Sequence, residues 1–148
     1  MRILLDTNVL VRVADPKDPD QGLAADALDR LDQQGHELRL VPQNLYELWV
    51  VGTRPKATNG LGFSSQEMQV LLQRFAELFP LLKDERGVID RWQALVIQQD
   101  VRGKQAHDAR IVAAMLRHGV DHLLTFNAAD FGRYSEIAVL SPGDVVSA

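Results

Sequence analysis

Four carboxylates stand where expected strands end or expected helices begin, and carboxylates in such places can hold a divalent cation. Asp6 directly follows the apolar run of residues 3–5, and Glu47 lies one turn into the helix after the second expected strand. Asp108 lies early in a later helix, and Asp130 follows a strand in LLTFNAADF. A carboxylate at the edge of a core is costly unless something pairs with it. We therefore expect these four side chains to converge.

Oxygen ligands of this kind suit Mg²⁺ or Mn²⁺ rather than zinc. Such ions lower the pKa of a bound water and stabilise charge on a phosphodiester during in-line attack. Taken singly, Asp108 also fits a helix-dipole partner, Glu47 a solvated helix residue and Asp130 a turn residue. Asp6 is the hardest to explain without a ligand, because Thr7 and Asn8 extend the polar patch beyond an apolar strand.

These residues are positioned by alternating strands and helices, a pattern typical of an α/β sandwich on a mostly parallel sheet. Apolar runs predict strands over residues 2–5, 38–41, 122–125 and 137–140, with 81–82 as a candidate short strand. Apolar residues at helical spacing predict helices over 9–14, 43–51 and 105–117, and around 23–31, 68–78 and 88–96. Ligands bind beyond the carboxyl ends of the strands in such sheets, which is where Asp6 lies.

Composition is that of one globular domain spanning residues 1–148. The chain is 46% apolar and 24% charged, without repeats or linkers. Cysteine is absent, which excludes disulfides and thiolate catalysis and fits a cytoplasmic protein. We expect no signal peptide and no membrane association, because charged residues interrupt the first apolar run. The net charge of −4 disfavours binding nucleic acid by bulk electrostatics but permits a cation in an acidic pocket.

Four segments in order, DTNVLV, NLYELW, HDARIVAAM and LLTFNAADF, resemble the successive acidic motifs of PIN-domain ribonucleases. The resemblance is greatest to the VapC-type toxins of bacterial toxin–antitoxin pairs, and it runs from Asp6 to Phe131. The loop TRPKATNGLGFS also resembles the loop after the acidic helix in many such toxins. The resemblance implies a PIN-like three-layer α/β/α sandwich with a central, mostly parallel sheet of four or five strands.

Carried over by position, the resemblance implies that Asp6, Glu47 and Asp108 bind the metal. The chain departs from the family pattern at Asn127, where many relatives have an aspartate before the Asp-Phe pair. Either Asp130 takes over this fourth position, or Asn127 ligates through its carbonyl oxygen, or a second metal is held weakly. The residues expected to orient the carboxylates are Thr7, Asn8 and Thr125.

The function implied is a Mg²⁺-dependent endoribonuclease, with Mn²⁺ as a substitute, inhibited by a cognate antitoxin and often homodimeric. An alternative is a PIN-like module that binds RNA or protein with little catalysis, for which the motivating residue is Asn127. An aspartyl-phosphate phosphatase with Asp6 as nucleophile is disfavoured, because such enzymes usually carry a second aspartate where this chain has Asn8.

Basic residues flank the acidic motifs and could contact RNA phosphates, although ordinary surface charge explains them equally well. They are Arg54, Lys56, Arg102, Lys104 and Arg110. His107 is expected to face solvent, because neighbouring helix residues point about 100° apart. Trp49 and Trp92 lie in apolar helical patterns and are expected in a core or an interface.

Overall fold

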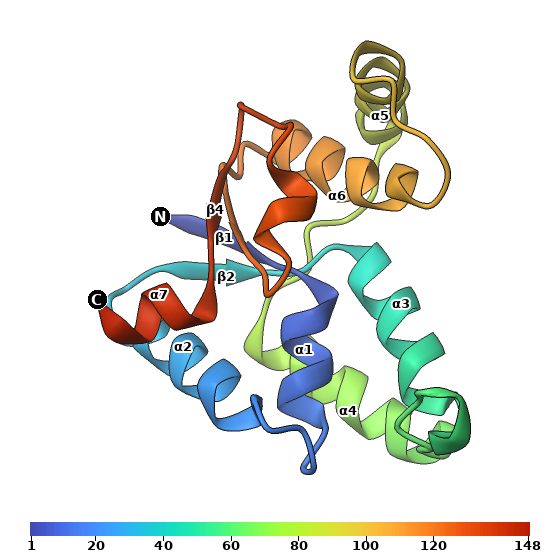
Figure 1. Cartoon of the computed structure of the whole chain (residues 1–148), viewed down its shortest axis with the longest axis vertical. Coiled ribbons are helices and arrows are strands. Elements are labelled where there is room, and N and C mark those ends of the chain that lie inside the picture. The colour runs from blue at the N-terminus through green and yellow to red at the C-terminus, as the bar shows by residue number, and fades with distance from the viewer.

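The computed structural model describes all 148 residues, which form an α/β fold around a four-stranded parallel sheet (Figure 1). The strands are β1 (Arg2–Leu5), β2 (Glu37–Arg39), β3 (His122–Leu124) and β4 (Ala138–Leu140). Their order in the sheet is β2-β1-β3-β4, and every pairing is parallel. All four carboxyl ends therefore lie at one edge, and β1 is central.

Helices flank both faces of the sheet. They are α1 (Thr7–Ala14), α2 (Gln21–Gln33), α3 (Pro42–Thr53), α4 (Ser65–Leu78), α5 (Arg86–Gln98), α6 (Gln105–His118) and α7 (Pro142–Ser147), with short 3₁₀ helices η1 (Lys56–Thr58) and η2 (Ala128–Phe131). In Figure 1, α5 and α6 lie together on one side of the sheet, while α1, α2, α4 and α7 lie on the other.

The alternation of side chains along β1 divides the core into two. Ile3 and Leu5 pack with residues of α1, α2, α3, α4 and α7, whereas Leu4 packs with residues of α5 and α6. All three side chains are fully buried. Because successive residues of a strand point to opposite faces, a wholly apolar strand requires cover on both sides. The expected three-layer α/β/α sandwich is confirmed.

Element boundaries differ from the sequence prediction mainly at the site. Helix α1 begins at Thr7, two residues earlier than expected, because the Asp6 carboxylate accepts the Thr7 amide and caps the helix. Strand β2 spans Glu37–Arg39 instead of reaching Val41. Residues 81–82 form no separate strand, and Leu81 makes only an isolated parallel bridge to Leu40. No helix is both long enough and apolar enough to cross a bilayer.

Candidate metal centre

Asp6 is the most firmly held of the four carboxylates. Its Oδ1 accepts the Thr7 amide at 2.8 Å, and its Oδ2 accepts the Thr125 hydroxyl at 2.7 Å and the Asn8 side-chain amide at 3.3 Å. The Asp6 amide itself donates to the carbonyl of Leu124 at 2.9 Å, which continues the pairing of β1 with β3. Thr7, Asn8 and Thr125, the three residues expected to orient the carboxylates, thus all donate hydrogen bonds to Asp6.

Glu47 is joined to β1 through two polar side chains. The Thr7 hydroxyl donates to Glu47 Oε1 at 3.0 Å, and it accepts the side-chain amide of Asn44 at 3.1 Å. Asn44 is fully buried, donates to the Leu5 carbonyl at 2.9 Å and accepts the Val41 amide at 2.8 Å. Sequence reasoning missed Asn44, although a buried-looking helix with an asparagine three residues before the glutamate was a usable signal.

Asp108 and Asp130 approach from the other side of the site. Together with Glu47 they line a hollow of about 300 Å³ that has no hydrophobic residue in its lining. The remaining lining residues are Lys104, Gln105 and His107. Asp108 lies in the first turn of α6, and Asp130 in η2, just past the end of β3. His107 is solvent-exposed, as predicted, yet it also lines this hollow.

Burial, and to a smaller extent mutual repulsion, raises the pKa of three of the carboxylates, Asp6, Glu47 and Asp108. Burial, followed by the charges of Asp6, Asp130 and Glu47, raises the pKa of Asp108 to about 6. Burial is also the largest cause of the raised pKa values of Asp6 and Glu47, and hydrogen bonds to each partly oppose the shift. A shift of this origin means that the ionised cluster lacks a compensating positive charge.

The donor set fits a hard divalent cation in its chemistry. All the candidate ligands are oxygens, and their combined negative charge is not matched by a paired cation at the centre. No three His, Cys, Asp or Glu side chains stand close enough together to form a ready-made cage. Mg²⁺ commonly keeps several waters and uses only one or two protein carboxylates, so this wider spacing is compatible with it.

The fourth acidic position has two candidates in different settings. The charge of Asp130 acts on both Asp6 and Asp108, so this carboxylate belongs electrostatically to the cluster. The side chain of Asn127 makes no hydrogen bond, and only its backbone amide is engaged, by the Thr125 hydroxyl at 3.0 Å. Both side chains are exposed.

A second hollow of about 350 Å³ adjoins Glu47 on the side of Thr7 and Asn8. Arg12 lies at its far wall, with its guanidinium 4.3 Å from the centre of the Phe126 ring. Arg12 also pairs with Asp18 at 3.4 Å and with Asp20 at 3.1 Å. The sequence prediction did not single out this arginine, which is already neutralised by its two aspartates.

Of the basic residues considered for RNA contacts, Lys104 alone lines the acidic hollow. Arg102 and Arg110 pair with nearby acids, Asp100 and Asp84. Arg54 donates to the Asn59 carbonyl within the loop after α3, and Lys56 begins η1 in that loop. Arg54 and Lys56 therefore belong to a separate loop rather than to the carboxylate cluster.

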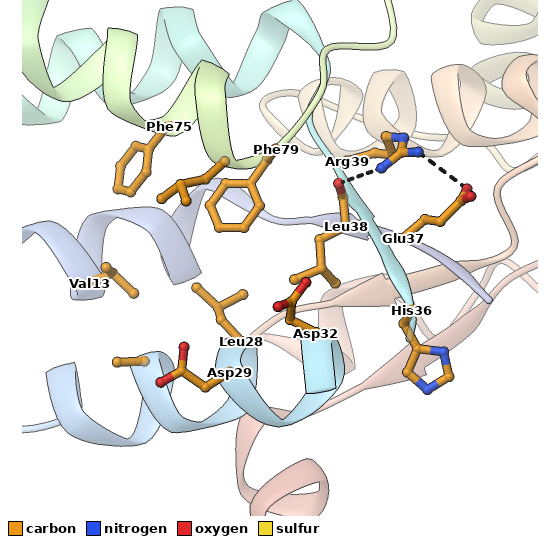
Figure 2. A pocket seen from close by; sticks show the side chains of 12 residues that line it. Val13, Leu28, Asp29, Asp32, His36, Glu37, Leu38, Arg39, Phe75 and Phe79 are labelled. Carbon is orange, nitrogen blue, oxygen red and sulfur yellow. Dashed lines mark hydrogen bonds and ion pairs between the residues drawn. The ribbon is translucent and has the colours of Figure 1, made fainter. Parts of the chain in front are cut away.

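A cavity of about 400 Å³ lies apart from the carboxylate cluster (Figure 2). Its apolar part is formed by side chains of α2, α4 and β2, including Leu28, Leu38, Phe75 and Phe79. Its polar residues are Asp29, Asp32, His36, Glu37 and Arg39. None of the candidate site residues lines it, so this cavity is separate from the candidate metal centre.

The PIN-domain family model matches residues 3–137, so the chain belongs to the PIN-domain family. Its fold is similar to that of chains in several solved structures. One is VapBC2 from Rickettsia felis bound to a promoter DNA fragment, with a TM-score of 0.69 and 18% identity over 95% of this chain and 98% of that chain. The second is VapBC-1 from nontypeable Haemophilus influenzae, with a TM-score of 0.68 and 17% identity over 97% of this chain and 99% of that chain. The third is FitAcB from Neisseria gonorrhoeae, with a TM-score of 0.66 and 21% identity over 95% of this chain and 98% of that chain. No curated protein sequence matches the chain.

Proposed function

We propose that this chain is a divalent-metal-dependent endoribonuclease and the toxin of a toxin–antitoxin pair. The observation that carries the proposal is the convergence of four carboxylates at the carboxyl edge of the sheet. Glu47, Asp108 and Asp130 line one hollow, and Thr7 is hydrogen-bonded to both Asp6 and Glu47. Membership of the PIN-domain family and the fold shared with VapBC and FitAB chains support it.

In the proposed site, Asp6, Glu47, Asp108 and Asp130 would hold Mg²⁺, some of them through its bound waters, and Mn²⁺ would substitute for it. When bound, the cation supplies a Lewis acid for the phosphodiester and lowers the pKa of water at the site. The hydrogen bonds from Thr7, Asn8 and Thr125 keep Asp6 oriented and ionised, and the Thr7 hydroxyl fixes Glu47. Lys104 is placed to contact an RNA phosphate beside the carboxylates.

We assign the fourth acidic position to Asp130 rather than to Asn127. The charge of Asp130 already acts on two of the other carboxylates, whereas the Asn127 side chain contacts none of them. A neutral amide would also contribute less to cation binding than a carboxylate.

Cleavage of RNA tests the proposal. The wild-type chain should cut RNA when Mg²⁺ or Mn²⁺ is present and should stop when the metal is chelated, whereas Asp6→Ala and Asp108→Ala should each lose most of the activity. Equal activity in all three proteins would rule out the proposed chemistry.

The proposed partners follow from the resemblance to VapC-type toxins. A cognate antitoxin would inhibit the enzyme by covering the acidic site, and we propose that the enzyme acts in the cytoplasm. We also propose a homodimer, which is supported by exposed apolar side chains on α3, namely those of Tyr46, Trp49 and Val50.

A second candidate function is favoured by one observation, the neutral Asn127 where many relatives carry an aspartate. If this substitution weakens the site enough, the chain would bind RNA or protein without cutting. Binding of RNA without any metal-dependent cleavage by the wild-type chain would favour this module over the nuclease.

A further inference from the structure

Gln43 forms a side-chain connection between the two helices that carry Glu47 and Asp108. It is the second residue of α3, and only 6% of it is exposed. Its Nε2 donates to the carbonyl of His107 in the first turn of α6 at 2.8 Å. No other side-chain hydrogen bond joins α3 to α6, and the two helices are not packed along their lengths.

The two ends of this bond are adjacent to the carboxylates in the chain. Glu47 lies one helical turn after Gln43, on the same face of α3, and Asp108 directly follows His107. The bond between Gln43 and the His107 carbonyl therefore joins the turn of α3 that precedes Glu47 to the backbone beside Asp108.

Gln43 occupies this position at a cost. Its Oε1 is buried and has no hydrogen-bond donor, and an unpaired buried acceptor destabilises a fold. The His107 carbonyl does not require the glutamine, because the regular α-helical pattern supplies it with the Ile111 amide. An apolar side chain of the same length would fill the space without leaving an unpaired acceptor, so stability does not explain the amide.

We propose that Gln43 is a positioning residue of the acidic site, which keeps Glu47 and Asp108 facing the same hollow, where a divalent cation would bind. This inference rests on the proposed metal-dependent function. Being buried, Gln43 cannot touch RNA, and it acts only through the two carboxylates.

The experiment measures Mn²⁺ binding to the chain through the electron paramagnetic resonance signal of free Mn²⁺. Urea unfolding without metal measures the stability of the same proteins. Gln43→Met should weaken Mn²⁺ binding by tenfold or more, the range found when residues that orient metal ligands are removed. Its stability without metal should equal or exceed that of the wild type. The KM for RNA should stay within about twofold, as expected for a residue that lies behind the carboxylates.

Gln21→Met is the matched control. The Gln21 side chain donates to the Val13 carbonyl at 3.0 Å, so its replacement removes the same kind of bond between α1 and α2, away from the carboxylates. Mn²⁺ binding should then match that of the wild type. Gln43→Asn keeps the amide but shortens the side chain, and it should lose Mn²⁺ affinity as Gln43→Met does. If Gln43→Met does not fold, Gln43→Asn alone tests the role of Gln43.

The outcomes separate this inference from the function on which it rests. Wild-type Mn²⁺ affinity in Gln43→Met, or in Gln43→Asn if only that variant folds, overturns the role of Gln43 and leaves the nuclease intact. The role of Gln43 is also overturned if Gln43→Met loses no more Mn²⁺ affinity than Gln21→Met does. A wild-type chain that neither binds Mn²⁺ nor cleaves RNA overturns both.

Discussion

Asp6 accepts three hydrogen bonds and still has a raised pKa, which shows how strongly burial and its neighbours oppose its charge. Asp6→Asn removes that charge while keeping the size of the side chain. We expect the melting temperature without metal to stay the same or to rise by about 2–4 °C, since repulsion is relieved. The stabilisation that Mn²⁺ gives the wild type should vanish.

Differential scanning calorimetry with and without Mn²⁺ measures both effects of Asp6→Asn. A fall of about 5 °C or more without metal would instead identify Asp6 as a structural residue whose hydrogen bonds matter more than its charge.

Asp108 makes a pH-dependent contribution to stability. Its pKa is about 6 in the folded chain and near 3.8 when unperturbed, so the folded state binds the extra proton between these values. Stability without metal should therefore fall as the pH rises from about 4 to about 6 and remain low above that. With allowance for solvent screening of a half-buried group, the Asp108 share is about 1–2 kcal/mol.

Urea unfolding of the wild type and of Asp108→Asn across this pH range isolates that contribution. The variant should be the more stable of the two at pH 7.5, and the difference should shrink toward pH 4. A constant difference between the two proteins would contradict the raised pKa of Asp108.

At the scale of elements, Asn44 links β1, the start of α3 and the Thr7 hydroxyl in one buried hydrogen-bond network. Asn44→Ala should destabilise the fold by about 2–3 kcal/mol, because it leaves buried backbone groups of Val41 and Leu5 without these partners. Urea unfolding measures the loss, and Gln66→Ala on the exposed side of α4 is the control. A cost below about 0.5 kcal/mol would mean that water replaces the asparagine.

The elements were largely predictable from apolar periodicity, whereas the hydrogen bonds between them were not. The apolar run of residues 3–5 predicts a strand, and the structure confirms it; that this strand lies inside the parallel sheet is seen only in the structure. The early start of α1 was missed, because it depends on the side chain of Asp6 turning back to its own helix. The spacing of apolar residues does not indicate such a local hydrogen bond between a side chain and the backbone.

The sequence indicated the four carboxylates of the candidate site and three residues beside Asp6, namely Thr7, Asn8 and Thr125, but it did not indicate Asn44 or Gln43. Asp6, Glu47, Asp108 and Asp130 share a position at strand ends or helix starts, which topology brings together. Asn44 and Gln43 act through partners distant in the chain, the carbonyls of Leu5 and His107, so nothing in their neighbours indicates the contact. Their roles emerge only from the packed structure.

At the scale of the molecule, an apolar strip on α3 leads us to expect a dimer. Tyr46 is 60% exposed, Trp49 38% and Val50 56%. Light scattering should give twice the 16.5 kDa of one chain for the wild type and one chain for Trp49→Glu. The matched control is Ile97→Glu on α5, where the replaced side chain is 80% exposed, and it should remain dimeric. A monomeric wild type, or the opposite pattern in the variants, would contradict this interface.

The central claim, a divalent cation held by four carboxylates, is tested most directly by anomalous diffraction from crystals grown with Mn²⁺. The account predicts an anomalous peak among Asp6, Glu47, Asp108 and Asp130, with the Asn127 side chain outside its coordination shell. A peak bound by Asn127 in place of Asp130 would correct the fourth ligand. The absence of any peak at this edge of the sheet, with Mn²⁺ present at a concentration that supports RNA cleavage, would contradict the account.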